Sequence, residues 1–344
     1  MTAAVDILVR GDGPVGCVAG LALSRFKTVR IVGKENRGAA FRPVVLSYAS
    51  RLILERLDVW QALRPTPIQT IHVSQAARFG RTVFEARDAG VPALGYVLEY
   101  SDLLHALREA IQDLLIEEEI EARCVVHAEG AAPDAEEKRY SQDALVASVR
   151  FAGAAESTAF ERFTHEGPLA LLPLPGGYAV VWSMRPESAQ RRMKMIDSEF
   201  LSDLAAAAGS RPGRPVAVER RAVQPLVLRV REKSVAERAV YIGNAAQTLH
   251  PVAGQGLNVG LRDAWDLAQI MRDAPDPGDA AVLRRFSVRR RLDATAAVRV
   301  TDLLAQAFLR TNPLNAVALT VLDIFPAARR FFARRMIFGP SALP

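Results

Sequence analysis

A glycine-rich turn near the N-terminus contains the first residues whose spacing could support chemistry. The apolar run Val5–Val9 precedes Gly11-Asp12-Gly13-Pro14-Val15-Gly16, and small residues from Cys17 to Ser24 follow it. This is G-x-G-x-x-G between a strand and a helix, where glycines admit a tight turn, a pyrophosphate and close helix packing. The pattern predicts a dinucleotide site at Gly11, Gly13, Pro14 and Gly16. The alternative is a glycine turn with a purely structural role.

A second such stretch is Tyr241–Asp263. An apolar run ending at Ile242 predicts a strand, and the segment from Gly254 to Asn258 leads into an amphipathic helix from about Val259 to Met271. A glycine turn beside a helix N-terminus presents backbone N–H groups and the positive end of the helix dipole at one point. Such a point attracts an anion or an electron-rich ring edge.

A dinucleotide site usually also has an acidic side chain at the end of the second strand, where it binds the adenosine ribose. In this chain the strand Val29–Val32 ends in Gly33, which is followed by Lys34 and Glu35. The acid is therefore absent from its usual place unless Glu35 reaches back. Lys34 would instead favour a phosphate.

Both helices and strands must position these turns. Helical spacing predicts helices over Ser47–Val59, Tyr100–Leu115, Phe200–Ala208 and Ala281–Phe308. Alternation and turn residues predict short strands within Pro65–Phe84, strands at Cys124–His127, Asp143–Phe151 and Ala222–Val230, and a hairpin of Leu169–Leu174 with Tyr178–Ser183. Residues 130–139 are expected to form an exposed loop.

Composition excludes several other classes of protein. The chain has 344 residues, of which 50% are hydrophobic, so it can bury a large core as two lobes or one elaborate α/β unit. Its two cysteines, Cys17 and Cys124, and its five histidines fall in no metal-ligand spacing, so no metal site is expected. No signal peptide or membrane-spanning run is evident, so we expect a soluble or peripheral protein of a reducing, cytoplasmic compartment.

The net charge of +6 suits nucleic acid, acidic lipid, a phosphate-bearing cofactor or simply a solvated basic surface. The arginines of Ala281–Phe308 are spread along an amphipathic helix without an aromatic stacking platform, so no nucleic-acid partner is expected. From Arg329 to Phe338 arginines lie beside phenylalanines. Such a helix can lie in the headgroup layer on the inner face of the cytoplasmic membrane, or dock on its own protein.

Several motifs, in order along the whole chain, resemble those of a known family. They are the Gly11/Gly13/Gly16 turn, Arg42, the segment Phe160–Pro173 with the sequence FERFTHEGPLALLP, and the segment Gly243–Asp263. The resemblance is to the FAD-dependent aromatic hydroxylases of ubiquinone biosynthesis, within the class like p-hydroxybenzoate hydroxylase. The last two segments are long and specific to that family.

The resemblance implies an α/β fold with a Rossmann-like FAD-binding domain, an inserted substrate domain with a mostly antiparallel sheet, and a C-terminal helical region. The expected bounds are 1–64, 93–139 and 220–310 for the FAD-binding domain, 65–92 and 140–219 for the substrate domain, and 311–344 for the tail. The implied reaction uses NAD(P)H to reduce FAD, and a flavin hydroperoxide then hydroxylates a polyprenylated phenol. Because the cofactor supplies this chemistry, no protein nucleophile is required.

The resemblance also implies roles for particular residues. Pro251, Gly254, Gln255 and Gly256 are expected at the reacting face of the flavin, and His250 is either a proton shuttle or a structural loop residue. The residues expected to bind the cofactor are Gly11, Gly13, Pro14, Gly16, Arg42, Gly243, Asn244, Gly254, Gly256, Leu257 and Asn258.

This chain departs from the family pattern at several points. Asn244 replaces an Asp, Glu129 replaces an Asp in Ala128-Glu129-Gly130, Gly33 lacks the acid, and the segment between residues 115 and 124 is short. A second hypothesis is therefore a degenerate, non-catalytic relative that assembles with other proteins of ubiquinone biosynthesis. The first hypothesis, an active monooxygenase, depends on the glycine turn and on Gly254–Asp263.

Overall fold

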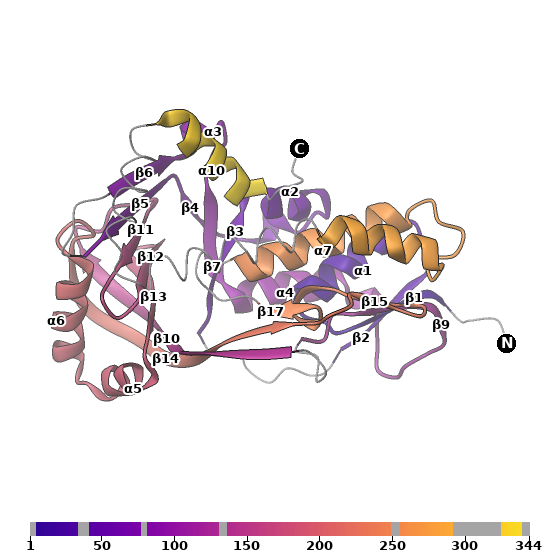
Figure 1. The fold of residues 1–344 in the computed structure, drawn as a ribbon, viewed down its shortest axis with the longest axis horizontal. Helices are drawn as coiled ribbons and strands as arrows, with labels where there is room; N and C mark the ends of the chain where they lie inside the picture. The colour runs from indigo at the N-terminus through magenta and orange to yellow at the C-terminus, as the bar shows by residue number, and fades with distance from the viewer. Residues whose placement is uncertain are drawn as a thin grey trace.

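The computed structural model describes residues 5–33, 41–76, 81–130, 136–248, 255–291 and 325–338. Figure 1 shows an elongated molecule with a parallel sheet and its helices in one lobe and a large, mostly antiparallel sheet in the other. A small three-stranded sheet lies between them (Figure 1). The expected α/β fold with an inserted antiparallel sheet is thus confirmed.

The parallel sheet forms the centre of the first lobe. Its strands, in spatial order, are β15 (Val235–Ala236), β16 (Ala239–Tyr241), β9 (Ala122–His127), β1 (Val5–Arg10), β2 (Val29–Val32) and β8 (Leu115–Ile116). All neighbours are parallel except β15 and β16, which pair antiparallel. The helices α1 (Pro14–Ser24) and α7 (Gln255–Met271) pack against each other beside this sheet. Ile7 and Leu8 of β1 point to opposite faces and are 0% and 2% exposed, because parallel strands covered on both sides are apolar on both faces.

The second lobe is built on an eight-stranded sheet. Its strands, in spatial order, are β17 (Gln247–Thr248), β14 (Arg214–Val230), β10 (Glu136–Ala152), β13 (Gly177–Met184), β12 (Pro168–Leu174), β11 (Thr158–Phe163), β5 (Thr70–Gln75) and β6 (Arg81–Glu85). All neighbours are antiparallel except β11 and β5. The helices α5 (Pro186–Lys194) and α6 (Asp197–Ala208) belong to this lobe, where Phe200, Tyr178 and Trp182 form a shared core.

The three-stranded sheet joins the lobes. It has the order β3 (Pro43–Ser47), β7 (Gly95–Glu99) and β4 (Thr66–Ile68). The remaining elements are α2 (Tyr48–Arg56), η1 (Trp60–Ala62), α3 (Ala86–Ala89), α4 (Tyr100–Ala110), η2 (Gln112–Leu114), η3 (Gly243–Ala245) and α10 (Pro326–Phe338). Leu46 and Tyr96 belong to the core of the first lobe, whereas Ile68 and Val97 pack against Ala159 of β11.

Several predicted boundaries were wrong. Residues 136–139, expected in a loop, are the start of β10, where they pair with β14. The helix expected to reach Leu115 ends at Ala110, because Leu115 pairs with Ile31 and extends the parallel sheet. The sequence patterns did not predict α5, a short helix that begins at Pro186, because its residues are mostly polar and give no clear apolar stripe. Residues 280–291 are helical, and the rest of the helix expected up to Phe308 lies outside the described residues.

The expected division into domains stays a proposal. Residues 139 and 220, where it separates the lobes, lie inside β10 and β14, which are each 17 residues long. These two strands run from the eight-stranded sheet of the second lobe towards the parallel sheet of the first lobe (Figure 1). They give the two lobes a continuous connection.

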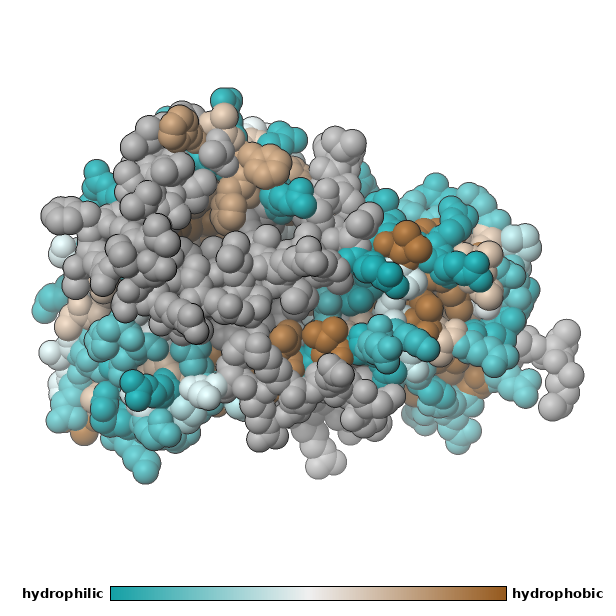
Figure 2. All heavy atoms as spheres, viewed as in Figure 1, coloured by the Kyte–Doolittle hydropathy of each residue, from teal (hydrophilic) through white to brown (hydrophobic). Residues whose placement is uncertain are grey.

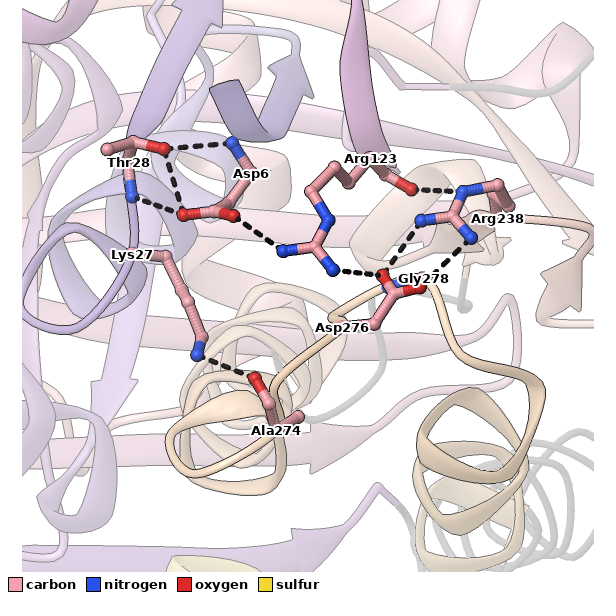
Figure 3. Close-up of polar contacts among 8 residues, drawn as sticks. All are labelled: Asp6, Lys27, Thr28, Arg123, Arg238, Ala274, Asp276 and Gly278. Carbon is pink, nitrogen blue, oxygen red and sulfur yellow. Dashed lines mark hydrogen bonds and ion pairs between the residues drawn. The ribbon is translucent and has the colours of Figure 1, made fainter. Parts of the chain in front are cut away.

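A polar network holds together the edge of the parallel sheet at which its strands begin (Figure 3). Asp6 accepts hydrogen bonds from the N–H and hydroxyl of Thr28 at 3.1 and 2.9 Å, and Arg123 lies 3.2 Å away. The Asp276 carboxylate accepts hydrogen bonds from the two terminal guanidinium nitrogens of Arg238, at 2.8 and 3.1 Å. Asp276 lies in the segment after α7, whereas the other four residues stand just before or at the start of β1, β2, β9 and β16, so the opposite edge is left for the glycine turns.

A buried ion pair fixes α7 on the following helical segment. Asp263 lies 3.0 Å from Arg290, and their side chains are only 4% and 8% exposed. Burial raises the pKa of the Asp263 carboxyl, while Arg290 and the Gly243 N–H act in the opposite direction by favouring its charged form. The same carboxylate thus holds α7, residues 280–291 and the turn at Gly243 together.

We predict that Arg290→Met lowers the free energy of unfolding by about 3–5 kcal/mol, because it leaves the Asp263 carboxylate buried without its counter-charge. The control is Arg87→Met, which removes a guanidinium that is 80% exposed beside Glu85 and should cost less than about 1 kcal/mol. Urea unfolding followed by circular dichroism measures both. Equal small losses would show that the buried pair does not hold α7.

Candidate functional site

The N-terminal glycine turn has the geometry expected of a dinucleotide-binding loop. Gly11 has a φ of +105°, and a Cβ atom there would lie 2.6 Å from the backbone of Glu129. A Cβ on Gly16 would lie 1.9 Å from the carbonyl oxygen of Gly11. Pro14 begins α1 and Gly13 precedes it as the N-cap without a side chain, so the first N–H groups of α1 face outward from the turn. The structure therefore requires glycine at Gly11 and Gly16 on steric grounds.

Val15 brings the second glycine stretch against this turn. A Cβ on Gly243 would lie 3.0 Å from Val15 Cγ1, and one on Gly260 would lie 2.7 Å from Val15 Cγ2. Gly243 also has a φ of +57°, in the left-handed region. Asn244, the next residue, is exposed. The start of α1, the turn at Gly243 and Asn244, and the first part of α7 therefore meet at one place, although 228 positions separate residues 15 and 243 in the sequence.

The first turn of α7 consists of Gln255, Gly256, Leu257 and Asn258, so the backbone N–H groups expected at the flavin belong to a helix N-terminus. The buried Asn258 side chain accepts hydrogen bonds from Ser47 N–H and Ser50 Oγ, both at 2.7 Å, and donates to the Val45 carbonyl at 2.8 Å. These bonds fix the start of α7 on β3 and α2.

The Asn258 side chain is thus engaged within the protein, so its predicted cofactor contact stays a prediction for its backbone, and Leu257 packs against the core of the first lobe. His250, Pro251 and Gly254 lie outside the described residues. Their predicted roles stay predictions.

Arg42 lies close to the glycine turn. Its guanidinium carbon is 4.9 Å from the ring centre of Tyr100, the first residue of α4. The Tyr100 hydroxyl is 3.8 Å from the position that a Cβ on Gly13 would take. Burial raises the pKa of Tyr100, although Arg42 opposes the shift. Arg42 is exposed beside the turn, where its charge favours a pyrophosphate.

Ala128, Glu129 and Gly130 follow β9 directly beside Gly11. The Ala128 N–H donates to the Arg10 carbonyl at 2.8 Å, and His127 Nδ1 lies 2.9 Å from Glu129 Oε1. Burial disfavours the charged form of Glu129, but the hydrogen bond from His127 brings the pKa of this carboxyl below its usual range. Glu129, whose side chain is longer than that of the Asp it replaces, is thus held by His127 beside the glycine turn.

The two faces of the large sheet have different neighbours. Leu171 and Trp182 belong to the core that includes Phe200 of α6, whereas Leu172 packs with Ile68 and Val97 of the three-stranded sheet. Leu172 therefore lies on the face towards the three-stranded sheet, and Leu171 and Trp182 lie on the other face, because successive residues of a strand point to opposite faces.

Glu161 lies on the face of the sheet that contains Leu172. It pairs with Ala170 of β12 and Val73 of β5, and so shares the face of Ala159 two positions earlier. Burial raises the pKa of Glu161 to about 7. This carboxyl therefore lies among apolar neighbours on the side of the sheet that faces the first lobe. The sequence patterns did not single it out.

The observed residues fit FAD. Two helix N-termini, the close-packed glycines and Arg42 provide N–H donors, space and positive charge for a pyrophosphate, and Asn244 provides an exposed amide oxygen that can accept from a hydroxyl. Within the described part of the chain, no three His, Cys, Asp or Glu side chains cluster as metal ligands. No helix among the described residues is long and apolar enough to cross a bilayer.

Comparison with known proteins agrees with this fit. The family model described as "FAD binding domain" matches residues 116–301. The chain is 27% identical to 3-demethoxyubiquinol 3-hydroxylase of Escherichia coli, over 90% of this chain and 91% of that protein. It is 28% identical to ubiquinone hydroxylase UbiL of Rhodospirillum rubrum, over 91% and 83% of the two chains. The crystal structure of p-nitrophenol 4-monooxygenase PnpA from Pseudomonas putida superposes with a TM-score of 0.77 at 14% identity, covering 98% and 99%.

Glu161 leads to a prediction about stability and pH. A carboxyl whose pKa is raised in the folded state costs stability when it is charged, so this cost is largest above pH 7 and fades as the pH falls towards 4.5. Glu161→Gln should therefore stabilise the protein at pH 8 by about 1–2 kcal/mol more than at pH 5. Exposed Glu156→Gln is the control. Chemical unfolding at both pH values measures the difference, and parallel profiles for the two variants would contradict it.

Proposed function

Because the chain belongs to the FAD-binding-domain family, we propose that it is an FAD-dependent monooxygenase that hydroxylates the phenol ring of a polyprenylated precursor of ubiquinone. The observation that supports this most is the close approach of Val15 to Gly243 and Gly260, which joins three segments predicted to bind the cofactor. The names of the two ubiquinone hydroxylases support the substrate class.

The cofactor would supply the oxidation. When bound and reduced by NAD(P)H, it would activate O₂ so that one oxygen atom enters an electron-rich ring and the other becomes water. The net change is phenol, O₂, NAD(P)H and a proton to hydroxylated phenol, water and NAD(P)⁺. The protein must then bind the cofactor and the substrate, orient them towards each other and exclude water from the site.

The residues of this chain divide those tasks. The N–H groups and positive end of α7 would stabilise negative charge on the flavin ring, since they are preorganised and need no rearrangement. The N-terminus of α1 and the guanidinium of Arg42 would hold the pyrophosphate. Ala170, Leu172 and Ala159 form an aliphatic part of the sheet face that fits an apolar substrate and excludes water.

A second candidate function is that of a non-catalytic accessory protein of the same pathway. It is favoured by Gly33 and by Asn244, which leave two of the usual acidic contacts to the cofactor without their acids. Such a protein would retain the fold and bind other proteins of ubiquinone biosynthesis. Flavin content and turnover separate the two candidates.

The wild type purified with FAD should show a flavin absorption spectrum, and a phenolic quinone precursor should increase NAD(P)H oxidation with formation of the hydroxylated product. Gly256→Val should reduce FAD affinity at least roughly tenfold, because its branched side chain projects from the first turn of α7. Gln269→Val, near the other end of α7, is the matched control. Bound flavin without product would favour the accessory role, and equal FAD affinity of both variants would place the flavin elsewhere.

The outer face of α10 supports a peripheral contact with an anionic membrane. Its inner face docks on the protein through Ala333, Ile337 and Phe338, which pack with Phe84 and Leu94. On the other side Phe331 is 67% exposed beside exposed arginines, and Figure 2 shows apolar residues among hydrophilic ones where α10 lies. A phenylalanine beside arginines suits the interface of an anionic bilayer.

Phe331→Ser should weaken co-sedimentation with vesicles containing phosphatidylglycerol by roughly tenfold, because it removes an apolar side chain without disturbing the docked face. Ile196→Ser, which changes a residue that is 64% exposed between α5 and α6, is the control. Loss of binding in both variants or in neither would contradict a role for α10.

A further inference from the structure

The carboxylate of Asp12 lies at the end of β2, where the sequence lacks an acid. Gly33 follows the last residue of β2, and the Gly11 N–H donates to the Val32 carbonyl at 2.8 Å. A Cβ on Gly33 would lie 2.5 Å from Asp12 Cγ and 2.7 Å from Asp12 Oδ2. Real Cβ contacts are not this short, so Asp12 occupies the space that a side chain at position 33 would need.

A neighbouring arginine orients this carboxylate. Arg108 of α4 lies 2.5 Å from Asp12 Oδ2, and the two side chains are 30% and 16% exposed. The Cys17 thiol lies 3.2 Å from the carbonyl oxygen of Asp12 and fixes its backbone on α1. Among the described residues, the contacts of the carboxylate use Oδ2, so Oδ1 can accept from a ligand.

The Arg108 contact also solves an electrostatic problem. A carboxylate inside a pyrophosphate-binding turn would repel the phosphates at close range. The positive charge of Arg108 offsets that repulsion, and Arg42 lies near the same turn across Tyr100. The turn can therefore contain an acid and still accept an anionic cofactor.

We propose that Asp12 replaces the missing acid of β2 and accepts a hydrogen bond from the adenosine ribose of FAD. The chemistry required there is a carboxylate oxygen close to the end of β2, where the ribose hydroxyls of a dinucleotide lie. In this chain the acid has moved from the strand end into the glycine turn, and Gly33 leaves room for it. This inference rests on the proposed FAD site.

The inference can be tested by removing the carboxylate at position 12 and placing one at position 33, at the end of β2. Asp12→Gly removes the carboxylate and also the Cβ that would lie 2.8 Å from a Cβ at position 33. Gly33→Glu alone should clash with Asp12, whereas the double variant has space for the glutamate. FAD dissociation constants of the four proteins are measured by flavin fluorescence, with circular dichroism to confirm folding.

Asp12→Gly should bind FAD roughly tenfold to a hundredfold more weakly than wild type, the range expected for a lost hydrogen bond to a charged group. The double variant should recover most of that loss. Equal affinity of wild type and Asp12→Gly, or a double variant no better than Asp12→Gly, would overturn the inference.

A ligand change isolates the ribose contact. The FAD analogue with 2′,3′-dideoxyadenosine should bind wild type more weakly than FAD does, whereas Asp12→Gly, which has no side-chain acceptor, should distinguish the two ligands much less. Equal discrimination by both proteins would show that Asp12 does not contact the ribose. If wild type binds FAD and the Asp12 variants bind FAD and the analogue as wild type does, only this inference fails. If folded wild type binds no FAD, the proposed cofactor site fails with it.

Discussion

The candidate site depends on backbone approaches that leave no room for a Cβ atom. Gly16 contacts the carbonyl oxygen of Gly11, and Val15 fills the space above Gly243 and Gly260. A side chain on any of these glycines would push α1, the turn at Gly243 and α7 apart. The Gly11 carbonyl is backbone and the Val15 side chain is branched and stiff, so both have little room to yield, and this constraint sets where two helix N-termini and an exposed Asn244 meet.

The rest of the first lobe supports that junction from two directions. The ion network around Asp6 and Asp276 holds the edge where the parallel strands begin, so the opposite edge is available for ligand contacts (Figure 3). The buried Asp263–Arg290 pair and the Asn258 hydrogen bonds hold α7 in place from within. Burial makes the pair sensitive to loss of either partner, whereas the exposed network contributes through its number of connections.

The sequence predicted what depends on local pattern. The strand, glycine turn and helix at residues 5–24, the hairpin around residue 176 and the helix up to Met271 all have short-range signals, and the structure has these elements, although the last helix begins at Gln255 and not at about Val259. The contact of Asp12 with Gly33 could not be predicted, since it depends on how β1 and β2 pair. Likewise, alternation shows that Leu171 and Leu172 face opposite sides but cannot say which side the α5 and α6 helices cover.

The central claim is that three segments distant in sequence bind one FAD together. Hydrogen exchange of the folded protein with and without saturating FAD, followed by mass spectrometry, tests it most directly. The account predicts slower exchange with FAD in residues 11–17, 243–246 and 255–260 together, with the edge at Arg123 and Asp276 unchanged. Protection confined to one of the three segments, or found only at the edge where the parallel strands begin, would contradict it.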